Sequence, residues 1–330
     1  MLFVNPSLEA STAVVTTTAA ARITAQRDDL AVNVASWLRH LRAENLSPAT
    51  IVTYTQSVAR LAEFLEANGM PLDVAAIRRE HVESFMEDLL ERFRPATAAN
   101  RYSGLQPFFK WLVDEGEIRE SPMARMRKPK VPEAPPPILT EDELRQLLKA
   151  IAGKGFDDRR DEAIVRLFIG TGARLSELAN LRWNPADPIH NDVDLDAGLV
   201  RVLGKGRRER TVYVGNEATR ALDRYIRARS KHRAVALPWL WLGPKGRFTS
   251  TGIGQMIKRR GAQAGMPHVH AHLFRHGWAH AMLGEGGMTE GDVMQLGGWR
   301  SRETLGRYAA ATRSERAIAA ARRFNPGDKL

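Results

Sequence analysis

A group of residues in the second half of the chain has the types and the spacing for chemistry on a phosphodiester. His272, Arg275 and His276 stand at positions i, i+3 and i+4. On a helix this spacing places all three side chains on one face. Arg174 lies about a hundred residues upstream, so only the fold can bring its guanidinium to the same place. Tyr308 adds a phenol that can serve as a nucleophile.

The reaction itself explains why these residue types are needed. Transfer of a phosphodiester requires a nucleophile, stabilisation of charge on the non-bridging oxygens and an acid for the departing oxygen. Arg174 and Arg275 can each present a planar fork to a phosphate, which a lysine cannot do. Between Arg224 and Gly284 the chain has no carboxylate, so few ligands for catalytic metal ions lie near His272 in the sequence. The pattern predicts that arginines act in place of metal.

In chain order, these motifs resemble the tyrosine recombinase (phage integrase) family, whose core is Arg, Lys, His-x-x-Arg, His or Trp, and Tyr. Residues 171–178 read TGARLSEL, similar to the family's first-arginine box, and residues 203–206 read LGKG, similar to its lysine turn. Residues 296–299 read LGGW, and a tyrosine follows nine residues later. The resemblance covers roughly residues 30–312. It implies catalytic roles for Arg174, Lys205, His272, Arg275, Trp299 and Tyr308.

The resemblance assigns a step to each of these residues. Lys205 would protonate the leaving 5′-oxygen, although its glycine-flanked turn could also be a solvated basic turn. A tyrosine in water has a pKa of about 10, so nearby arginines must favour the phenolate of Tyr308, or a base such as His272 must take its proton. Trp299 can donate a hydrogen bond but cannot act as an acid. It could also be a core tryptophan, since the two roles can hold together.

Two further residues are expected to support the site. Glu177, three residues after Arg174, would orient basic groups, although an ordinary surface acid is nearly as good an interpretation. His276 is expected to be a structural or phosphate-adjacent partner. Residues 184–192 depart from the compact turn that the family often has at this point, so the sequence leaves the supporting acid there open.

The histidines also suggest a metal site, which we consider the weaker hypothesis. Five of the nine histidines fall between His268 and His280, and His272, His276 and His280 have i, i+4, i+8 spacing. The zinc-protease helix, however, requires a glutamate directly after its first histidine, and Leu273 stands there. We therefore expect no metal and no cofactor.

Composition points to a polyanionic partner for the C-terminal part. The 330 residues carry a net charge of +11. Residues 1–120 hold 12 Lys and Arg against 16 Asp and Glu, and the remaining residues hold 37 against 22. Cysteine is absent, which excludes disulfides and thiolate metal ligands. No apolar run reaches the ~18 residues of a membrane span, so we expect an intracellular protein without membrane contact. The family resemblance implies the bacterial cytoplasm or nucleoid.

Patterning along the chain predicts two domains. Ser47 and Pro48 can begin a helix, and a second amphipathic run places Leu105, Phe108, Phe109 and Leu112 on one face. Thr140 and Glu143 form a capping-box pattern. Residues 198–202 and 210–214 have the composition of two strands joined by the lysine turn. The fold class expected is mainly α with a small antiparallel β-sheet (α+β).

The expected boundaries follow from these signals. Residues 1–27 form a flexible leader, 28–120 a helical DNA-binding domain, 121–138 a basic proline-rich linker, and 139–312 the catalytic domain. The resemblance implies that the tail, 313–330, docks on a neighbouring protomer. DNA contacts are expected from Thr97, Asn100, Arg101, Lys258, Arg259 and Arg260.

The sequence therefore predicts a metal-independent, site-specific tyrosine recombinase that forms a 3′-phosphotyrosyl link to DNA. By resemblance, its partners are double-stranded DNA with a specific recombination site and three further copies of the chain, as a tetramer. Two alternatives remain: a relaxing topoisomerase of type IB, and a DNA-binding regulator whose catalytic site has decayed.

Overall fold

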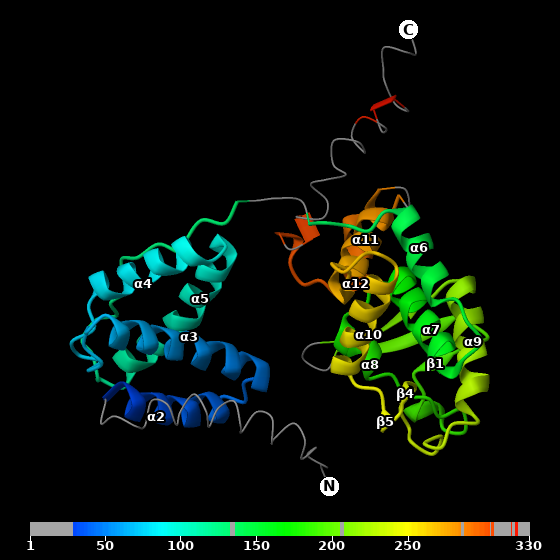
Figure 1. Ribbon diagram of the computed structural model, residues 1–330, viewed down its shortest axis with the longest axis horizontal. Coiled ribbons are helices and arrows are strands. Elements are labelled where there is room, and N and C mark those ends of the chain that lie inside the picture. Colours follow the sequence, from blue (N-terminus) through cyan, green and yellow to red (C-terminus); the bar gives the residue numbers. More distant parts are fainter. Residues whose placement is uncertain are drawn as a thin grey trace. The chain divides into compact units, whose positions relative to one another are not determined.

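The computed structural model describes residues 29–132, 136–204, 208–284, 287–303, 305–306, 318 and 321–322. The chain divides into two compact units, Met1–Glu133 and Ala134–Leu330 (Figure 1). Each unit has a hydrophobic core of its own.

The described part of the first unit contains four helices, α2 (Asp29–Ala43), α3 (Pro48–Ala67), α4 (Arg79–Arg92) and α5 (Pro95–Asp114). The predicted start of α3 is confirmed, because the Ser47 side chain accepts a hydrogen bond from the backbone N–H of Thr50 and Pro48 occupies the first turn. Helix α3 packs against α2, α4 and α5. These contacts bury the apolar faces that the sequence pattern indicates.

Helix α5 supplies the centre of this core. Leu105, Phe108, Phe109 and Leu112 are all fully buried, as their common face predicts. The chain after α5 continues to pack on the same unit, since the Tyr102 hydroxyl donates to the carbonyl of Met126 over 2.8 Å. The start of the expected linker thus lies against the first unit.

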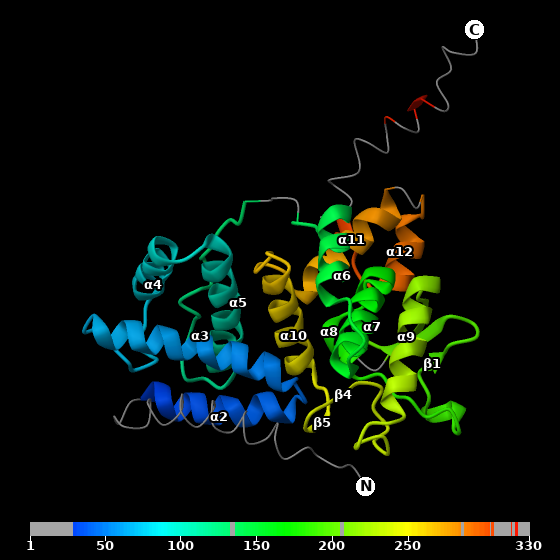
Figure 2. The ribbon, with the colours of Figure 1, turned by 45° about the vertical axis from the view of Figure 1, so that its right-hand side comes forward.

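The second unit begins with helices that surround one core. They are α6 (Glu141–Ile151), α7 (Phe156–Thr171), the single turn α8 (Leu175–Ala179) and α9 (Asn216–Arg229). The capping box of Thr140 and Glu143 is confirmed at the start of α6. Helix α7 ends at Gly172, whose positive φ of 56° is the left-handed conformation that glycine adopts at little cost. Helices α7 and α9 run side by side (Figure 1 and Figure 2).

A small antiparallel sheet lies between α8 and α9 in the sequence. Its order is β1 (Val193–Asp194), β2 (Leu199–Leu203) and β3 (Glu209–Tyr213). The two predicted strands are therefore present, each displaced by one residue. Val202 pairs with Arg210 across β2 and β3, and the buried residues Val200, Val202 and Val212 join the core. A second pair of strands, β4 (Leu242–Gly243) and β5 (Gly246–Arg247), precedes the last helices.

Three helices complete the described part of the second unit: α10 (Ser250–Gln263), α11 (Ala271–Leu283) and α12 (Glu290–Gly297). Helix α11 packs on α7 and on α12. Trp278, Trp299 and Leu305 lie in a smaller apolar cluster at this end of the unit. The predominance of helices with small antiparallel sheets confirms the expected fold class. Among the described helices, none combines the length and apolarity needed to span a membrane.

Candidate active site

Arg174 is positioned by the turn that starts α8. It is the residue before the first turn of that helix, and its backbone N–H donates to Glu177 Oε2 over 2.8 Å. Its side chain doubles back, with Nη1 donating to Glu177 Oε1 (2.8 Å) and Nη2 to the carbonyl of Gly298 (2.9 Å). The side chain remains 36% exposed. Glu177, which is buried, therefore binds both the backbone and the side chain of Arg174.

Arg275 is positioned by helix α11, on which it lies. Its Nη1 donates to the carbonyl of Gly172 over 2.8 Å, and the guanidinium carbon lies 3.6 Å from the ring centre of Trp299. This stacking is the geometry of a cation–π interaction. Trp299 in turn stacks on Trp278 with ring centres 6.1 Å apart. Arg275 itself is almost fully buried, so its side chain is fixed before any DNA binds.

His272 and His276 lie one turn apart on α11, with ring centres 4.6 Å apart. Burial lowers the pKa of His272, and electrostatic interactions with Arg275, His270 and Arg174 lower it further. Burial also lowers the pKa of His276 to about 4. The Nδ1 of His276 lies 3.2 Å from the carbonyl of Pro137, which can only accept, so Nδ1 carries the proton. Both rings are neutral at pH 7, and His272 can accept a proton.

A further arginine belongs to this arrangement, and sequence reasoning missed it. Arg210, on β3, donates from Nη1 and Nη2 to the two oxygens of Glu177 over 3.0 and 2.7 Å. Burial works to raise the pKa of Glu177, but hydrogen bonds from Arg210 and the backbone of Arg174, together with the charge of Arg210, lower it to about 2. A signal existed, because strand alternation places Arg210 on the same buried face as Val212.

Among these residues, Arg174, Arg210 and Trp299 line a cavity of about 540 Å³. Its lining includes four arginines, Arg174, Arg208, Arg210 and Arg300, together with Trp299. Gly204, the residue before Lys205 in the sequence, also lines it. A cavity with this many guanidinium groups suits a phosphate, because arginine forks match phosphate oxygens bidentately.

The structure thus brings four of the predicted catalytic residues together: Arg174, His272, Arg275 and Trp299. Lys205 and Tyr308 lie outside the described residues, as do the expected leader 1–27 and most of the expected tail 313–330. Leu305, three residues before Tyr308 in the sequence, is buried in the cluster that contains Trp278 and Trp299. Within the described residues, no cluster of histidine and acidic side chains has the arrangement of a metal site.

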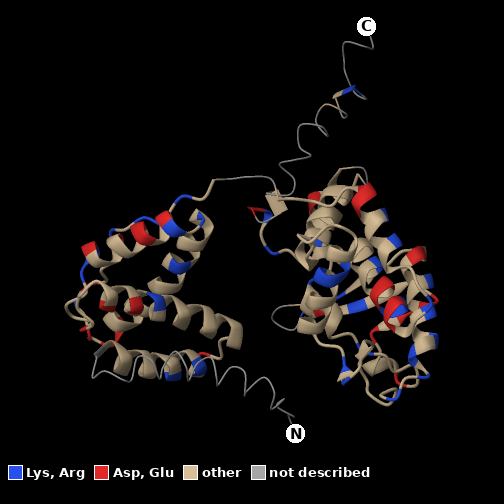
Figure 3. Ribbon diagram, in the orientation of Figure 1, with Lys and Arg blue, Asp and Glu red and all other residues tan. Residues whose placement is uncertain are grey.

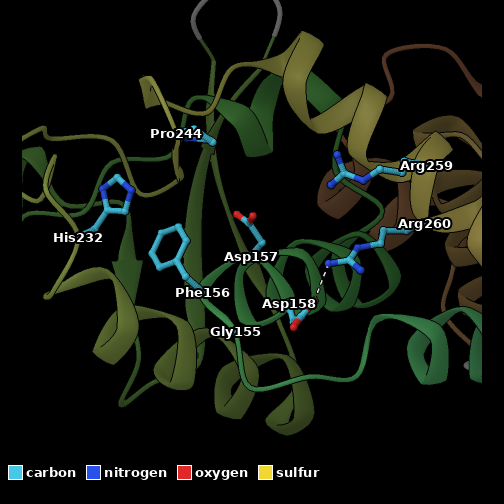
Figure 4. A pocket seen from close by; sticks show the side chains of 8 residues that line it. All are labelled: Gly155, Phe156, Asp157, Asp158, His232, Pro244, Arg259 and Arg260. Atoms are coloured by element: carbon cyan, nitrogen blue, oxygen red, sulfur yellow. Dashed lines mark hydrogen bonds and ion pairs between the residues drawn. The ribbon is translucent and has the colours of Figure 1, made fainter.

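The predicted DNA-contacting residues of α10 differ from one another in environment. Arg260 donates to Asp158 and Asp161 over 2.8 Å in each case, and Lys258 is exposed. Figure 4 shows Arg259 and Arg260 beside Asp157 and Asp158 in a pocket of about 570 Å³. Helix α7 therefore supplies carboxylates to a segment that has none in its own sequence. Acidic and basic ribbon stretches accordingly lie close together around α7 (Figure 3).

The predicted contacts of the first unit lie on α5. Asn100 is exposed, whereas Thr97 and Arg101 are half-buried. The pKa of Arg101 is lowered by burial and by the neighbouring positive charge of Arg60. Two cations held close together in this way are favoured by a nearby polyanion.

Comparison with known proteins agrees with these features. Residues 137–315 match the phage integrase family, and residues 34–117 match the N-terminal SAM-like domain of phage integrases. The chain is 34% identical over 268 residues to the tyrosine recombinase XerC of Xanthomonas campestris pv. campestris, covering 80% of each chain. It is 32% identical over 254 residues to XerC of Azotobacter vinelandii, covering 75% of this chain and 81% of that one.

Solved structures show the same fold. The Tn1549 transposon integrase in complex with transposon right end DNA is 18% identical, with a TM-score of 0.68, covering 90% of this chain and 99% of that one. The XerH recombinase bound to palindromic difH substrate is 17% identical, with a TM-score of 0.67, covering 94% and 95%. The motifs, the converging side chains and the match over more than half of its length agree: this chain belongs to the phage integrase family of tyrosine recombinases.

Proposed function

We propose that this protein performs site-specific DNA recombination with Tyr308 as its nucleophile. The phenolic oxygen attacks a DNA phosphate, the bond to the 5′-oxygen breaks, and a 3′-phosphotyrosyl link forms. Attack by the 5′-hydroxyl of a partner duplex reverses the step, so the energy of the bond is retained. Membership of a family that cleaves and rejoins DNA supports this assignment.

The observation that carries the proposal is the meeting of Arg174 and Arg275 at Gly298 and Trp299. Arg174 donates to the Gly298 carbonyl, and Arg275 lies over the ring of the next residue, Trp299. Two guanidinium groups so fixed can stabilise charge on the non-bridging oxygens as it develops, without reorganising during the reaction. They also favour the phenolate, because a positive charge nearby lowers a tyrosine pKa.

Proton transfers complete the step. The neutral His272 is assigned to receive the proton of Tyr308, since its lowered pKa leaves the ring unprotonated at pH 7. Lys205 is assigned to protonate the leaving 5′-oxygen, a role that rests on the resemblance of its turn to the family's lysine turn. Trp299 packs the site and can donate its indole N–H.

The assembly is proposed to contain four protomers on two duplexes, cleaving in alternating pairs, with the tail 313–330 docked on a neighbour. Similar structures described as a XerH–difH complex and a transposon integrase–DNA complex support double-stranded DNA as the partner. We propose the bacterial cytoplasm or nucleoid as the place where the protein meets this DNA. Thr97, Asn100, Arg101, Lys258, Arg259 and Arg260 remain the proposed DNA contacts.

A nicked duplex tests the proposal. The recombination site is first selected from genomic fragments by gel shift, and a nick is then placed so that the 5′-hydroxyl fragment diffuses away after cleavage. The protein should accumulate a detergent-stable DNA adduct through a 3′-phosphate, at the same rate with and without EDTA. Binding without an adduct would support the decayed regulator instead. Relaxation of supercoiled DNA of any sequence would support the topoisomerase.

A further inference from the structure

Arg210 is hydrogen-bonded through all three nitrogens of its guanidinium group. Its side chain is only 9% exposed. Nη1 and Nη2 donate to the two oxygens of Glu177, and Nε donates to the carbonyl of Leu296 over 2.7 Å. These bonds use three of the five N–H groups of the guanidinium.

The bonds connect three separate elements. Arg210 lies on β3, Glu177 on α8, and Leu296 in the last turn of α12. Arg174 makes a parallel connection, from the same carboxylate to the carbonyl of Gly298. The two arginines therefore bind the same buried carboxylate, and they also donate to two carbonyls at the end of α12, those of Leu296 and Gly298.

Close packing gives this connection little freedom. Gly298 adopts a positive φ of 66°, and a Cβ atom at this residue would lie 2.9 Å from Nη1 of Arg210. A Cβ on Gly204 would lie 3.4 Å from Glu177 Oε1 and 3.5 Å from Arg210 Nη1. The guanidinium thus fills the space between the turn after α12 and the end of β2.

The consequence for Arg174 follows from the carboxylate. With both oxygens of Glu177 bound to Arg210, the carboxylate plane is fixed, and the direction of the bond to Arg174 Nη1 is fixed with it. Without Arg210, Glu177 would keep only the donors of Arg174 and could rotate about its side-chain torsions. Arg174 would then lose its alignment towards the cavity that both arginines line.

We propose that Arg210 is a positioning residue for DNA cleavage: it fixes Glu177, and through Glu177 the phosphate-binding guanidinium of Arg174, against the end of α12. This inference rests on the proposed function of the site. Three acceptors around one planar group require a fork, so a lysine at this position can replace the charge but not the set of bonds.

The test compares three variants for single-turnover adduct formation on the nicked duplex, for affinity to the same DNA, and for thermal unfolding. Arg210→Gln should slow adduct formation roughly 10- to 100-fold, the loss typical of a hydrogen bond to a charged group. Its affinity for DNA should change by less than about threefold, because the phosphate contacts elsewhere remain. Arg210→Lys should be intermediate in rate.

Arg201→Gln is the matched control. Arg201 lies on the neighbouring strand β2 and also makes an ion pair to a carboxylate, with Asp192 (3.2 Å), and bonds to the carbonyls of Ile189 and Asn191. It faces the segment after α8 rather than Arg174. Its removal should leave the rate of adduct formation unchanged, whatever it does to thermal stability.

A double variant shows whether Arg210 acts through Glu177. If it does, Arg210→Gln should slow a Glu177→Gln protein by less than about threefold, because the carboxylate that it positions is already gone. Multiplicative losses would overturn the inference, as would a wild-type rate in a folded Arg210→Lys or Arg210→Gln protein. Loss of DNA affinity and of thermal stability in parallel with rate would also overturn it, in favour of a purely structural role. Failure of the wild type to form any adduct would instead contradict the proposed function.

Discussion

At the scale of single residues, the site depends on where one negative charge is placed among several positive ones. Glu177 is buried, is ionised, and binds both Arg174 and Arg210. Of these two arginines, Arg174 has the larger exposed fraction, so more of its surface is open to a phosphate in the cavity. Removal of the Arg174 side chain should therefore lower the rate of DNA cleavage much more than the affinity for DNA.

Arg174→Ala should bind the recombination site almost normally and lose 10²–10³-fold in adduct formation, the cost of one donor that stabilises developing charge. Gel shift and single-turnover cleavage of the nicked duplex measure the two quantities separately. Arg166→Ala is the control, since Arg166 pairs with Glu162 outside the cavity. A rate of adduct formation within tenfold of the wild-type rate in Arg174→Ala would show that Arg174 does not act in the reaction.

The charge on Glu177 also predicts how stability varies with pH. Its folded pKa is about 2, below the ordinary value of 4.5. A carboxyl group with a lowered pKa stabilises the fold above pH 4.5, and this contribution is lost as the pH falls towards 2. The difference in unfolding free energy between wild type and Glu177→Gln, from denaturant titrations, should therefore shrink between pH 5 and pH 3. A constant difference would contradict the ionised state of Glu177.

Side chains in local motifs were the predictable ones. The boxes around Arg174, His272 and Arg275 could be found because each carries its own sequence pattern, and the helix at 271–283 sets the relation between His272 and Arg275. Strand alternation places Arg210 on the inner face of β3, but its partners could not be identified from the sequence, because Glu177 and Leu296 are 33 and 86 residues away. The pairing of Arg260 with Asp158 and Asp161 was hidden for the same reason.

At the scale of elements, the turn between α7 and α8 connects the two halves of the phosphate site. Gly172 ends α7, its carbonyl binds Arg275, and Arg174 begins α8 two residues later. A Cβ at Gly172 would lie 2.5 Å from the ring of Trp278. Neither the backbone nor the ring has room to move independently.

Gly172→Ala should therefore destabilise the protein by more than the about 1–2 kcal/mol that a left-handed conformation costs a residue with a side chain. Gly265→Ala is the matched control in the same unit, because Gly265 has a φ of 76° and only an ordinary contact to Gln146. Denaturant titration of both variants gives the comparison. Equal destabilisation would show that Trp278 is not held tightly under this turn.

Element boundaries were predictable to the extent that local chemistry sets them. Ser47 and Thr140 begin helices through their own side chains, which is information contained within four residues. The strands β2 and β3 were displaced by one residue, because the hydrogen-bond register across the hairpin, rather than composition, decides where a strand begins.

At the scale of the whole molecule, the two units differ in charge, and we propose that each contributes basic residues to DNA binding. If both bind, several phosphates are neutralised, and the log–log plot of affinity against salt should have a slope of about −0.9 per contacted phosphate. Fragments 1–133 and 134–330, tested separately, should bind the site far more weakly and with shallower slopes. Full affinity in either fragment alone would contradict a shared interface.

The sequence predicted two units from a proline-rich basic stretch, but it carries no pattern that fixes how they act together.

The proposed reaction depends on Tyr308 as the nucleophile, so the decisive measurement identifies the residue to which DNA becomes attached. Wild type incubated with the nicked duplex should give one DNA-linked peptide, containing Tyr308. Tyr308→Phe should bind the site but form no adduct, because it lacks only the hydroxyl. Tyr213→Phe, which alters an exposed tyrosine on β3, should behave as wild type. An adduct that persists in Tyr308→Phe, or that maps to Tyr213 or to a serine, would contradict the account.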